Sequence, residues 1–463
     1  MKNIRGENTL ETQTKYQNNP LGYAPVMGLI GKFAIPSIIS LLVASIYNIT
    51  DQAFIGHIIG IHGNAATSVA FPTLILATAF SQLIAIGTAS NFNINQGKQN
   101  HGEAARYVET GLALLCVMGM AIFSVVFLFK KPILLLCGAT ETVMPYALPY
   151  LTITAFGLPF HLFSNASSAI IRSDGSPTYS MTCMIFGAVL NIFLDWLFMF
   201  IFNWGIEGAA FATSLSQFMT AMLCIRYYFR FNAFKIHLKN LKIRSSYAIN
   251  IFKLGLSNFI NQIVMMIVNI VLNNTLTKYG AMSIYGPDIP LAVAGVAAKI
   301  NSIIISFSVG LSQGCQPIWS YNMGAKQFNR VKEAYFKGLM TGIAIGAIGF
   351  TAFHLFPHQI LSLFGSGNQL YFEFGALYLK TYLFMVTFHS VQAMTVNYFT
   401  GTGHVKSGIL MSLSRQGFFL LPFLIALPMF FGIKGALYAG PIADTLACLL
   451  AAALMYRNFK NLK

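Results

Sequence analysis

Residues 111–129, GLALLCVMGMAIFSVVFLF, contain no charged side chain and are long enough to cross the hydrocarbon core of a bilayer as a helix. Comparable apolar runs recur through the whole chain of 463 residues, of which 56% are hydrophobic and only 9% are charged. Soluble domains carry about a quarter charged residues, so a soluble protein of this composition could not cover its surface. The long runs also differ from the alternating segments of about ten residues in a membrane β-barrel. The sequence therefore predicts an all-α polytopic membrane protein.

We expect twelve transmembrane helices, each bounded by glycine, proline or a charged residue. They divide into an N-terminal six-helix lobe over residues 29–229 and a C-terminal six-helix lobe over 251–456. A basic, polar linker at 230–250 joins the lobes, and tails cover 1–28 and 457–463. The expected helices cover residues 29–56, 65–94, 105–129, 143–171, 178–201, 206–229, 251–277, 289–321, 333–355, 370–400, 407–430 and 434–456.

Three short motifs recur at nearly the same spacing in the two halves. The pairs are GIEGA at 205–209 with GIKGA at 432–436, NQG at 95–97 with NMG at 322–324, and Phe-His at 160–161 with Phe-His at 388–389. Because each half holds six spans, both halves insert the same way up and are pseudo-symmetric about an axis along the membrane normal. Such two-lobed folds usually place a substrate path between the lobes and alternate its access.

The basic residues, which give the chain a net charge of +16, fall mainly in the connections on one side of the predicted membrane. Because cytoplasmic loops carry an excess of lysine and arginine, this asymmetry predicts that both termini are cytoplasmic. We expect that face to contact membrane lipid rather than nucleic acid. The residues assigned to it are Lys98, Arg106, Arg172, Arg226, Arg230, Lys235, Lys239, Lys242, Arg244, Lys253, Lys326, Arg330, Lys332, Lys406 and Arg415; the opposite face has little beyond Lys130, Lys131, Lys278 and Lys434.

Several polar residues fall at membrane depth, where an ionisable group costs about 2.5–3.5 kcal/mol. Asp51 ends a stripe of small or polar residues at helical spacing, and Asn191 and Asp195 lie one turn apart on the fifth helix. At ~1.5 Å per residue, Asp51, Asp195 and Thr213 all lie roughly 10 Å below the outer surface. We therefore expect one shared polar pocket in the N-terminal lobe; the alternative is that each aspartate is simply hydrated near the interface. The stripe consists of Ser37, Ser40, Ala44, Tyr47 and Asp51.

Two carboxylates in a medium of low dielectric constant cannot both ionise cheaply, so such a pair can hold a proton and release it. Together with Asn191 and Thr213, the same oxygens would also suit Na⁺. The sequence does not choose between the two ions. A polar face on the fourth helix, formed by His161, Asn165 and Ser168, is a candidate accessory part of this pocket.

The C-terminal lobe carries two further polar groups of interest. Lys299 and Asp444 share a depth, which predicts a structural ion pair. A face of the seventh helix, together with a methionine of the tenth, is a candidate lining for an adaptable substrate cavity, the alternative being ordinary core packing. These residues are Asn258, Gln262, Met265, Asn269 and Met394.

Motifs for catalysis or for direct use of ATP are absent from the sequence. It contains no GxxxxGK[ST] phosphate loop, no HExxH and no paired metal spacing. We therefore expect a protein that is not an enzyme and needs no cofactor beyond a coupling ion.

Several of these segments resemble sequence patterns of the MATE (multidrug and toxic compound extrusion) family. In the first half they are 47–56 (YNITDQAFIG), Arg172 with 174–177 (DGSP), 191–195 (NIFLD) and 205–213 (GIEGAAFAT). In the second half, 313–317 (QGCQP), 321–325 (YNMGA) and 415–417 (RQG) with Pro422 resemble the bacterial MepA-like branch. The resemblance extends over all twelve expected helices.

This resemblance implies a V-shaped pair of lobes in a bacterial cytoplasmic (inner) membrane, exporting organic cations in exchange for inward H⁺ or Na⁺. By position, it implies that Asp51, Asn191, Asp195 and Thr213 form the cation-coupling pocket, with Tyr47 at its rim. Other members use acidic residues of helices 7 and 10, but here helix 7 has none and helix 10 has only Glu373. We therefore expect coupling in the N-terminal lobe of a monomeric protein.

Two alternatives stay open. A lipid-linked precursor flippase of the same superfamily would usually carry extra helices and a cationic central cavity, whereas the only deep cation expected here is Lys299. The second alternative is a non-transporting membrane receptor or assembly factor. Buried aspartates argue against it, because they are energetically costly and such a protein would not need them.

Overall fold

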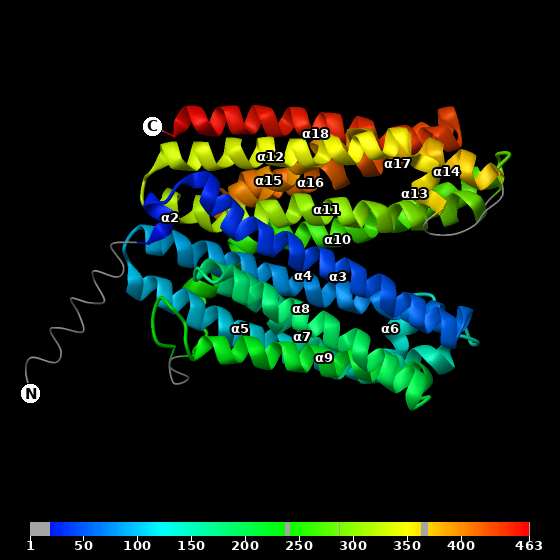
Figure 1. The fold of residues 1–463 in the computed structure, drawn as a ribbon, viewed down its shortest axis with the longest axis horizontal. Coiled ribbons are helices and arrows are strands. Elements are labelled where there is room, and N and C mark those ends of the chain that lie inside the picture. The colour runs from blue at the N-terminus through cyan, green and yellow to red at the C-terminus, as the bar shows by residue number, and fades with distance from the viewer. Residues whose placement is uncertain (1–18, 237–240, 287, 363–368, 463) are drawn as a thin grey trace, which may run out of the picture.

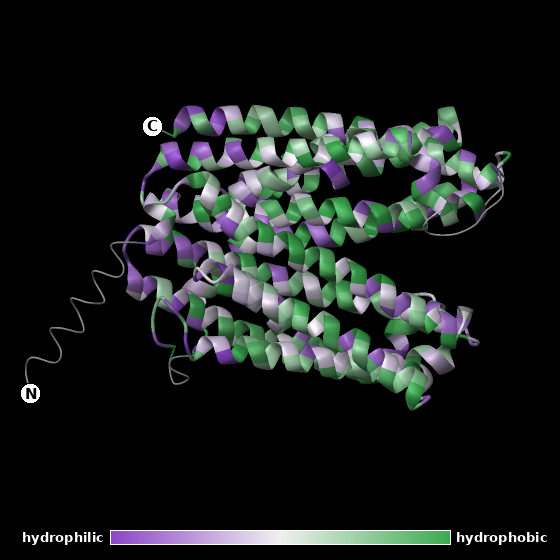
Figure 2. Ribbon diagram, in the orientation of Figure 1, coloured by the Kyte–Doolittle hydropathy of each residue, from purple (hydrophilic) through white to green (hydrophobic). Residues whose placement is uncertain are grey.

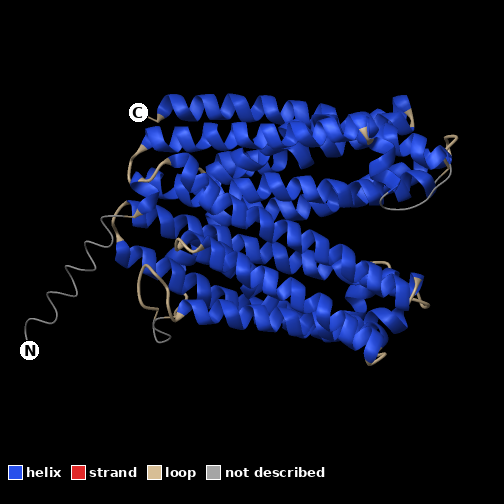
Figure 3. Cartoon of the chain, in the orientation of Figure 1, coloured by secondary structure: helices blue, strands red, loops and turns tan. Residues whose placement is uncertain are grey.

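The computed structural model describes residues 19–236, 241–286, 288–362 and 369–462, and these ranges are helical with no β-strand (Figure 3). Hydrophobic residues dominate the helices, and hydrophilic residues are frequent at both of their ends (Figure 2). Ten of the described helices have both the length and the hydropathy needed to cross a membrane. Residues 1–18 of the expected N-terminal tail and Lys239 of the expected linker lie outside the described ranges.

The N-terminal half contains six long helical segments that match the six predicted spans. In order, its elements are α2 (Pro20–Tyr23), α3 (Val26–Ile58), α4 (Ile61–Gly97), α5 (His101–Leu128), α6 (Lys130–Leu136), α7 (Met144–Ser173), α8 (Pro177–Asp195), the π-helical η1 (Trp196–Ile201) and α9 (Gly205–Tyr228).

The C-terminal half likewise contains the six predicted spans, two of them interrupted. Its elements are α10 (Ser245–Ala281), α11 (Asp288–Gly324), α12 (Phe328–Leu355), α13 (Pro357–Ser362), α14 (Gln369–Tyr382), the 3-10 segment η3 (Phe384–Phe388), α15 (His389–Gly401), α16 (Val405–Leu413), the π-helical η4 (Ser414–Leu420), α17 (Leu421–Phe431) and α18 (Ile433–Asn461).

Two of the twelve predicted spans form helices in the structure but are not among the ten that are long and apolar enough to cross a membrane by composition alone. The first, α7, carries His161, Asn165 and several serines and threonines among its apolar residues. The second is broken into α14 and α15 by η3, where Met385 has non-helical backbone angles. A polar helix and a broken helix at membrane depth both indicate contact with protein rather than with lipid.

The two halves form a V in which α3–α9 lie on one side and α10–α18 on the other (Figure 1). They meet at the end that bears both termini and diverge toward the other end. At the closed end the backbones approach so closely that only glycine fits: a Cβ at Gly255 of α10 would clash with the carbonyl group of Leu83 on α4, and one at Gly97 with that of Tyr321 on α11. Gln316 Nε2 also donates to Ser90 Oγ across the buried interface at 2.9 Å.

The first helix of each half packs partly into the core of the other half. Leu29 and Phe33 of α3 belong to the same buried cluster as Trp319 of α11. Conversely, Ala248 and Ile251 of α10 belong to the main cluster of the N-terminal half. The closed end of the V is therefore an interlocked core and not a surface contact.

The segment that leads from α9 toward α10 is held on the N-terminal half by Asp174, which follows α7. Asp174 Oδ2 accepts hydrogen bonds from the Asn232 backbone N–H at 2.7 Å and from the Tyr227 hydroxyl at 2.8 Å. Its Oδ1 accepts from the Ala233 N–H at 3.0 Å. Burial raises the pKa of Asp174 to about 7, and the three hydrogen bonds oppose that rise. One buried carboxylate thus fixes the start of the connection between the halves.

We expect Asp174→Ala to lower the free energy of unfolding by about 3 kcal/mol, because each buried donor left without an acceptor costs ~1–3 kcal/mol. The measurement is thermal unfolding of the purified protein in detergent. Glu207→Ala, which removes an exposed carboxylate at the first turn of α9, is the matched control and should change stability little. Equal stability of the two variants would contradict the anchoring role of Asp174.

Candidate functional site

Two carboxyl groups meet in the outer half of the N-terminal lobe. Asp51 of α3 and Asp195, the last residue of α8, lie within hydrogen-bonding reach of each other. Asp195 is fully buried, and Asp51 is mostly buried. The depth count placed these two residues at one level, and the structure brings them together laterally as well.

The oxygens of this pocket lack donors. No described residue donates a hydrogen bond to Asp51 Oδ1, to either carboxylate oxygen of Asp195 or to Asn191 Oδ1, and all four atoms are buried. A buried oxygen without a donor is costly, and two facing carboxylates repel when both are charged. A proton shared between the carboxyl groups, or a cation held by the four oxygens, would remove both costs. The arrangement therefore fits binding of H⁺ or of a hard cation.

Local helix geometry positions the remaining members of the pocket. Asn191 precedes Asp195 by one turn, and its Nδ2 donates to Thr213 Oγ1 of α9 at 3.5 Å. Immediately after Asp195 the helix changes to the π-helical η1; such segments occur often at functional sites. Tyr47 lies one turn before Asp51 on α3 and beside its carboxyl group. The four predicted residues and Tyr47 thus come from α3, α8 and α9.

Tyr150 of α7 belongs to this pocket and was not predicted. It lies beside Asp51, Asp195 and Tyr47, and its ring packs on the small cluster formed by Ile55, Met199 and Ala209. Tyr150 lies near the outer end of α7, at about the depth of the two aspartates. The depth count that joined the aspartates would have found it if uncharged aromatic residues had been included.

The candidate accessory residues of α7 make their polar contacts elsewhere. His161 Nε2 pairs with Thr78 Oγ1 of α4 at 3.0 Å, and Asn165 Oδ1 accepts from Gln82 Nε2 at 3.2 Å. Ser168 Oγ pairs with Ser180 Oγ of α8 at 2.8 Å. These pairs tie α7 to α4 and α8, so the three residues are placed in helix–helix contacts and not against the carboxylates.

The predicted pair of Lys299 and Asp444 is wrong. Asp444 Oδ1 accepts from Arg415 Nε, and Asp444 Oδ2 lies 3.6 Å from His389 Nε2. Equal depth did not mean contact, because α11 packs against α3, α4, α12 and α15, whereas α18 packs against α17, η4, α14 and α15. Arg415, assigned to the cytoplasmic face, is instead largely buried in η4 beside this carboxylate.

The candidate substrate-cavity residues divide into two groups. Asn258, Gln262, Met265 and Asn269 recur along one face of α10 and are half-buried to exposed. Met394 is fully buried in the core of the C-terminal half, where it fills the space beside Gly338 of α12. Its assignment to a cavity lining is therefore wrong, and the alternative of core packing is correct for this residue.

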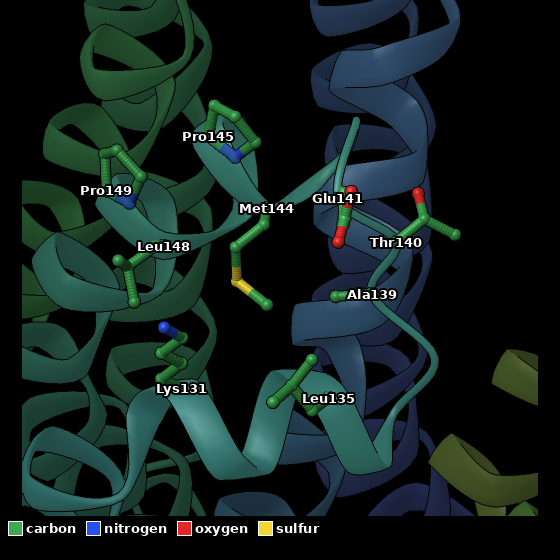
Figure 4. A pocket seen from close by; sticks show the side chains of 9 residues that line it. All are labelled: Lys131, Leu135, Ala139, Thr140, Glu141, Met144, Pro145, Leu148 and Pro149. Carbon is green, nitrogen blue, oxygen red and sulfur yellow. The ribbon is translucent and has the colours of Figure 1, made fainter.

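A cavity of about 520 Å³ lies at the outer end of the N-terminal half, between α6 and the start of α7. Figure 4 shows Met144 and Leu135 pointing into it, with Lys131 and Glu141 at its margins. A second cavity of about 500 Å³ lies at the closed end, between α2 and the inner ends of α4 and α11. None of the predicted site residues lines either cavity.

Comparison with known proteins gives a family match over most of the chain. The family model described as MatE matches residues 36–197 and 254–425. Among curated proteins, a multidrug export protein MepA from Staphylococcus haemolyticus (strain JCSC1435) is 26% identical over 431 residues, which cover 92% of each chain. The matched segments include Asp51, Asn191 and Asp195.

Solved structures agree with this match. The MATE multidrug transporter DinF-BH, solved in complex with R6G, is 31% identical and superposes with a TM-score of 0.87, covering 94% of this chain and 96% of that one. An outward-facing multidrug resistance MATE family transporter of the MOP superfamily is 22% identical with a TM-score of 0.88, covering 96% and 99%. The V of Figure 1 is thus an arrangement that solved proteins adopt.

Proposed function

The chain belongs to the MatE family of membrane transporters, and from this premise we propose that it is a multidrug efflux antiporter. It exports organic cations and other drugs in exchange for inward H⁺ or Na⁺ by alternating access. Relatives that carry the names multidrug export protein and multidrug transporter support the substrate class. The chain is a transporter and not an enzyme.

The proposal is carried by the carboxyl pair of Asp51 and Asp195, whose oxygens have no donor among the described residues. If the pair had only a structural role, its buried and unpaired oxygens would destabilise the protein in every conformation. A coupling role requires a site that is costly when empty and stable when loaded, because only then does the ion change the energy of one conformation. The pair, Asn191 and Thr213 meet that requirement for H⁺ and for Na⁺ alike.

The shape of the molecule supports entry of the ion from the outer side. The V is closed at the end bearing the termini, which the basic connections assign to the cytoplasm. Asp51 lies in the last turns of α3 and Asp195 at the end of α8, and both helices end on the diverging side of the V (Figure 1). Loading the pair from outside lowers the negative charge of the pocket and lets α3, α8 and α9 close around it. A drug held between the lobes is released by that change.

Several narrower assignments belong to the same proposal. The lobes extend over residues 29–229 and 251–456, both termini are cytoplasmic, and the monomer is the transporting unit. The α10 face formed by Asn258, Gln262, Met265 and Asn269 contributes to the drug path. The protein resides in a bacterial cytoplasmic membrane.

The test is uptake by proteoliposomes of a fluorescent organic cation such as rhodamine 6G under a pH gradient alone and a Na⁺ gradient alone. We expect one gradient to drive dye movement in the wild type and neither to do so in Asp51→Asn. Movement under neither gradient, with folded protein and several dyes, would overturn the proposal in favour of a flippase or a non-transporting protein.

A further inference from the structure

A second group of ionisable side chains lies buried in the C-terminal half. His389 of α15, Arg415 of η4 and Asp444 of α18 come from three helical segments and contact one another. Arg415 Nε donates to Asp444 Oδ1, Arg415 Nη2 lies 3.2 Å from His389 Nε2, and His389 Nε2 lies 3.6 Å from Asp444 Oδ2. The side chains of His389, Arg415 and Asp444 are 8%, 18% and 6% exposed.

The group lies near the middle of the membrane. Counted from the ends of α15, α16 and α18 at the closed side of the V, the three residues lie about 15–25 Å deep at ~1.5 Å per residue. Ionisable residues at that depth are costly and are therefore candidates for a functional site, and transporter sites recur near the midplane on discontinuous helices.

Two of the three segments depart from a regular α-helix at this point, and the third carries a proline. His389 follows directly on the 3-10 segment η3, Arg415 lies within the π-helical η4, and Pro441 lies one turn before Asp444. An ion pair serving only to join η4 and α18 would need neither of the first two irregularities. Their coincidence at one cluster indicates a built site.

The groups around His389 differ in the hydrogen-bonding role that they offer to its ring. Arg415 Nη2 can only donate, so in this contact the lone pair of His389 Nε2 is the acceptor. The lone pair of that nitrogen also faces Asp444 Oδ2, a second acceptor. His389 Nε2 thus lies between a donor, Arg415, and an acceptor, Asp444. When this nitrogen gains a proton, it stops accepting from Arg415 and donates to Asp444 instead.

We propose that His389, Arg415 and Asp444 form a second proton-binding site, distinct from the carboxyl pair of the N-terminal lobe. A proton from water forms the Nε2–H bond of His389, which then donates to Asp444 Oδ2. The hydrogen bond from Arg415 Nη2 to the ring breaks, and the cluster passes from neutral to a charge of +1. No electron is transferred. The link between this protonation and export rests on the proposed transport function.

The surroundings of the ring contain no further charged group that would compete for this proton among the described residues. From α18 the cluster meets Cys448 in addition to Asp444, and the end of α14 contributes Tyr382. The elements α12 and α11 present Gly342 and Ser312 to α15. The charge balance is therefore set by Arg415 and Asp444, with an uncharged thiol and phenol beside them.

The internal repeat supplies a matched control. His161 occupies the position in the N-terminal half that corresponds to His389, but it pairs with the neutral hydroxyl of Thr78. No carboxylate lies within salt-bridge distance of His161 among the described residues, so nothing there stabilises the imidazolium form. The two histidines share a place in the repeat and differ in the chemistry of their partners.

The experiment counts protons taken up by purified protein in detergent when the pH falls from 8 to 5.5, by indicator titration. We expect His389→Gln to take up about one proton fewer than the wild type, because glutamine has no ring nitrogen to accept that proton. Gln Oε1 can still accept from Arg415, so the fold is preserved. His161→Gln should match the wild type. Proton uptake by His389→Gln equal to the wild type would overturn the proposal.

A second variant guards against misfolding of the first. Arg415→Gln combined with Asp444→Asn leaves His389 intact in a neutral setting, and we expect the same loss of one proton. Retention of that proton in a folded double variant would also overturn the proposal. The counts are made without transport, so they stand if the proteoliposome test fails. In transporting vesicles, His389→Gln should lower the number of protons exchanged per dye.

Discussion

Replacing Asp195 by asparagine is expected to reduce gradient-driven export to the level of protein-free vesicles while leaving the protein folded. Asparagine keeps the size and hydrogen-bonding capacity of the side chain but cannot exchange a proton, and it removes one negative charge from the pocket. Its amide can donate to the Asp51 carboxylate, which has an oxygen without a donor in the wild type. The free energy of unfolding should therefore stay the same or rise, because a repelling buried pair has become a hydrogen-bonded one.

The measurement pairs dye export from proteoliposomes with thermal unfolding of the same preparations. Asp288→Asn, which changes an exposed acidic residue in the first turn of α11, is the control and should transport as the wild type does. A folded Asp195→Asn protein that exports at the wild-type rate would show that the carboxyl pair has no part in coupling. Loss of export together with loss of stability would instead assign Asp195 a structural role.

The sequence predicted well those features that depend on position along the membrane normal. All twelve spans correspond to helices, and the depth count joined Asp51, Asp195 and Thr213 in one pocket. Both results follow from comparing the rise of a helix per residue with the thickness of the bilayer. Helix boundaries differ most where the chain leaves the membrane: α10 begins at Ser245, six residues before the prediction.

Features that depend on which helices are neighbours could not be predicted in the same way. Lys299 and Asp444 share a depth, but α11 and α18 lie in different parts of the C-terminal half, so Asp444 pairs with Arg415. Met394 is covered by α12 because Gly338 leaves room for its side chain. The sequence around Met394 could not predict this contact, because it depends on which helix packs beside it. Tyr150 was missed because the depth count left the aromatic residues of α7 out.

Removing the charge of Arg415 alone should cost about 3–5 kcal/mol in the free energy of unfolding, because it leaves Asp444 buried and without its guanidinium partner. Asp444 is only 5% exposed, so water cannot readily replace that partner. Arg415→Met is the suitable change, since methionine fills most of the space of the arginine stem and isolates the loss of charge from the loss of volume.

The double variant Arg415→Met with Asp444→Leu should recover most of that loss, because a buried ion pair replaced by apolar residues of similar size is often neutral or stabilising. Thermal or denaturant unfolding of the wild type, both single variants and the double variant completes a mutant cycle, and we expect a large coupling energy. A double variant as unstable as Arg415→Met would mean that the charges themselves hold α18 against η4. Recovery of stability would instead leave the ion pair without a stabilising role. Its presence at mid-membrane would then be accounted for by what it does with His389.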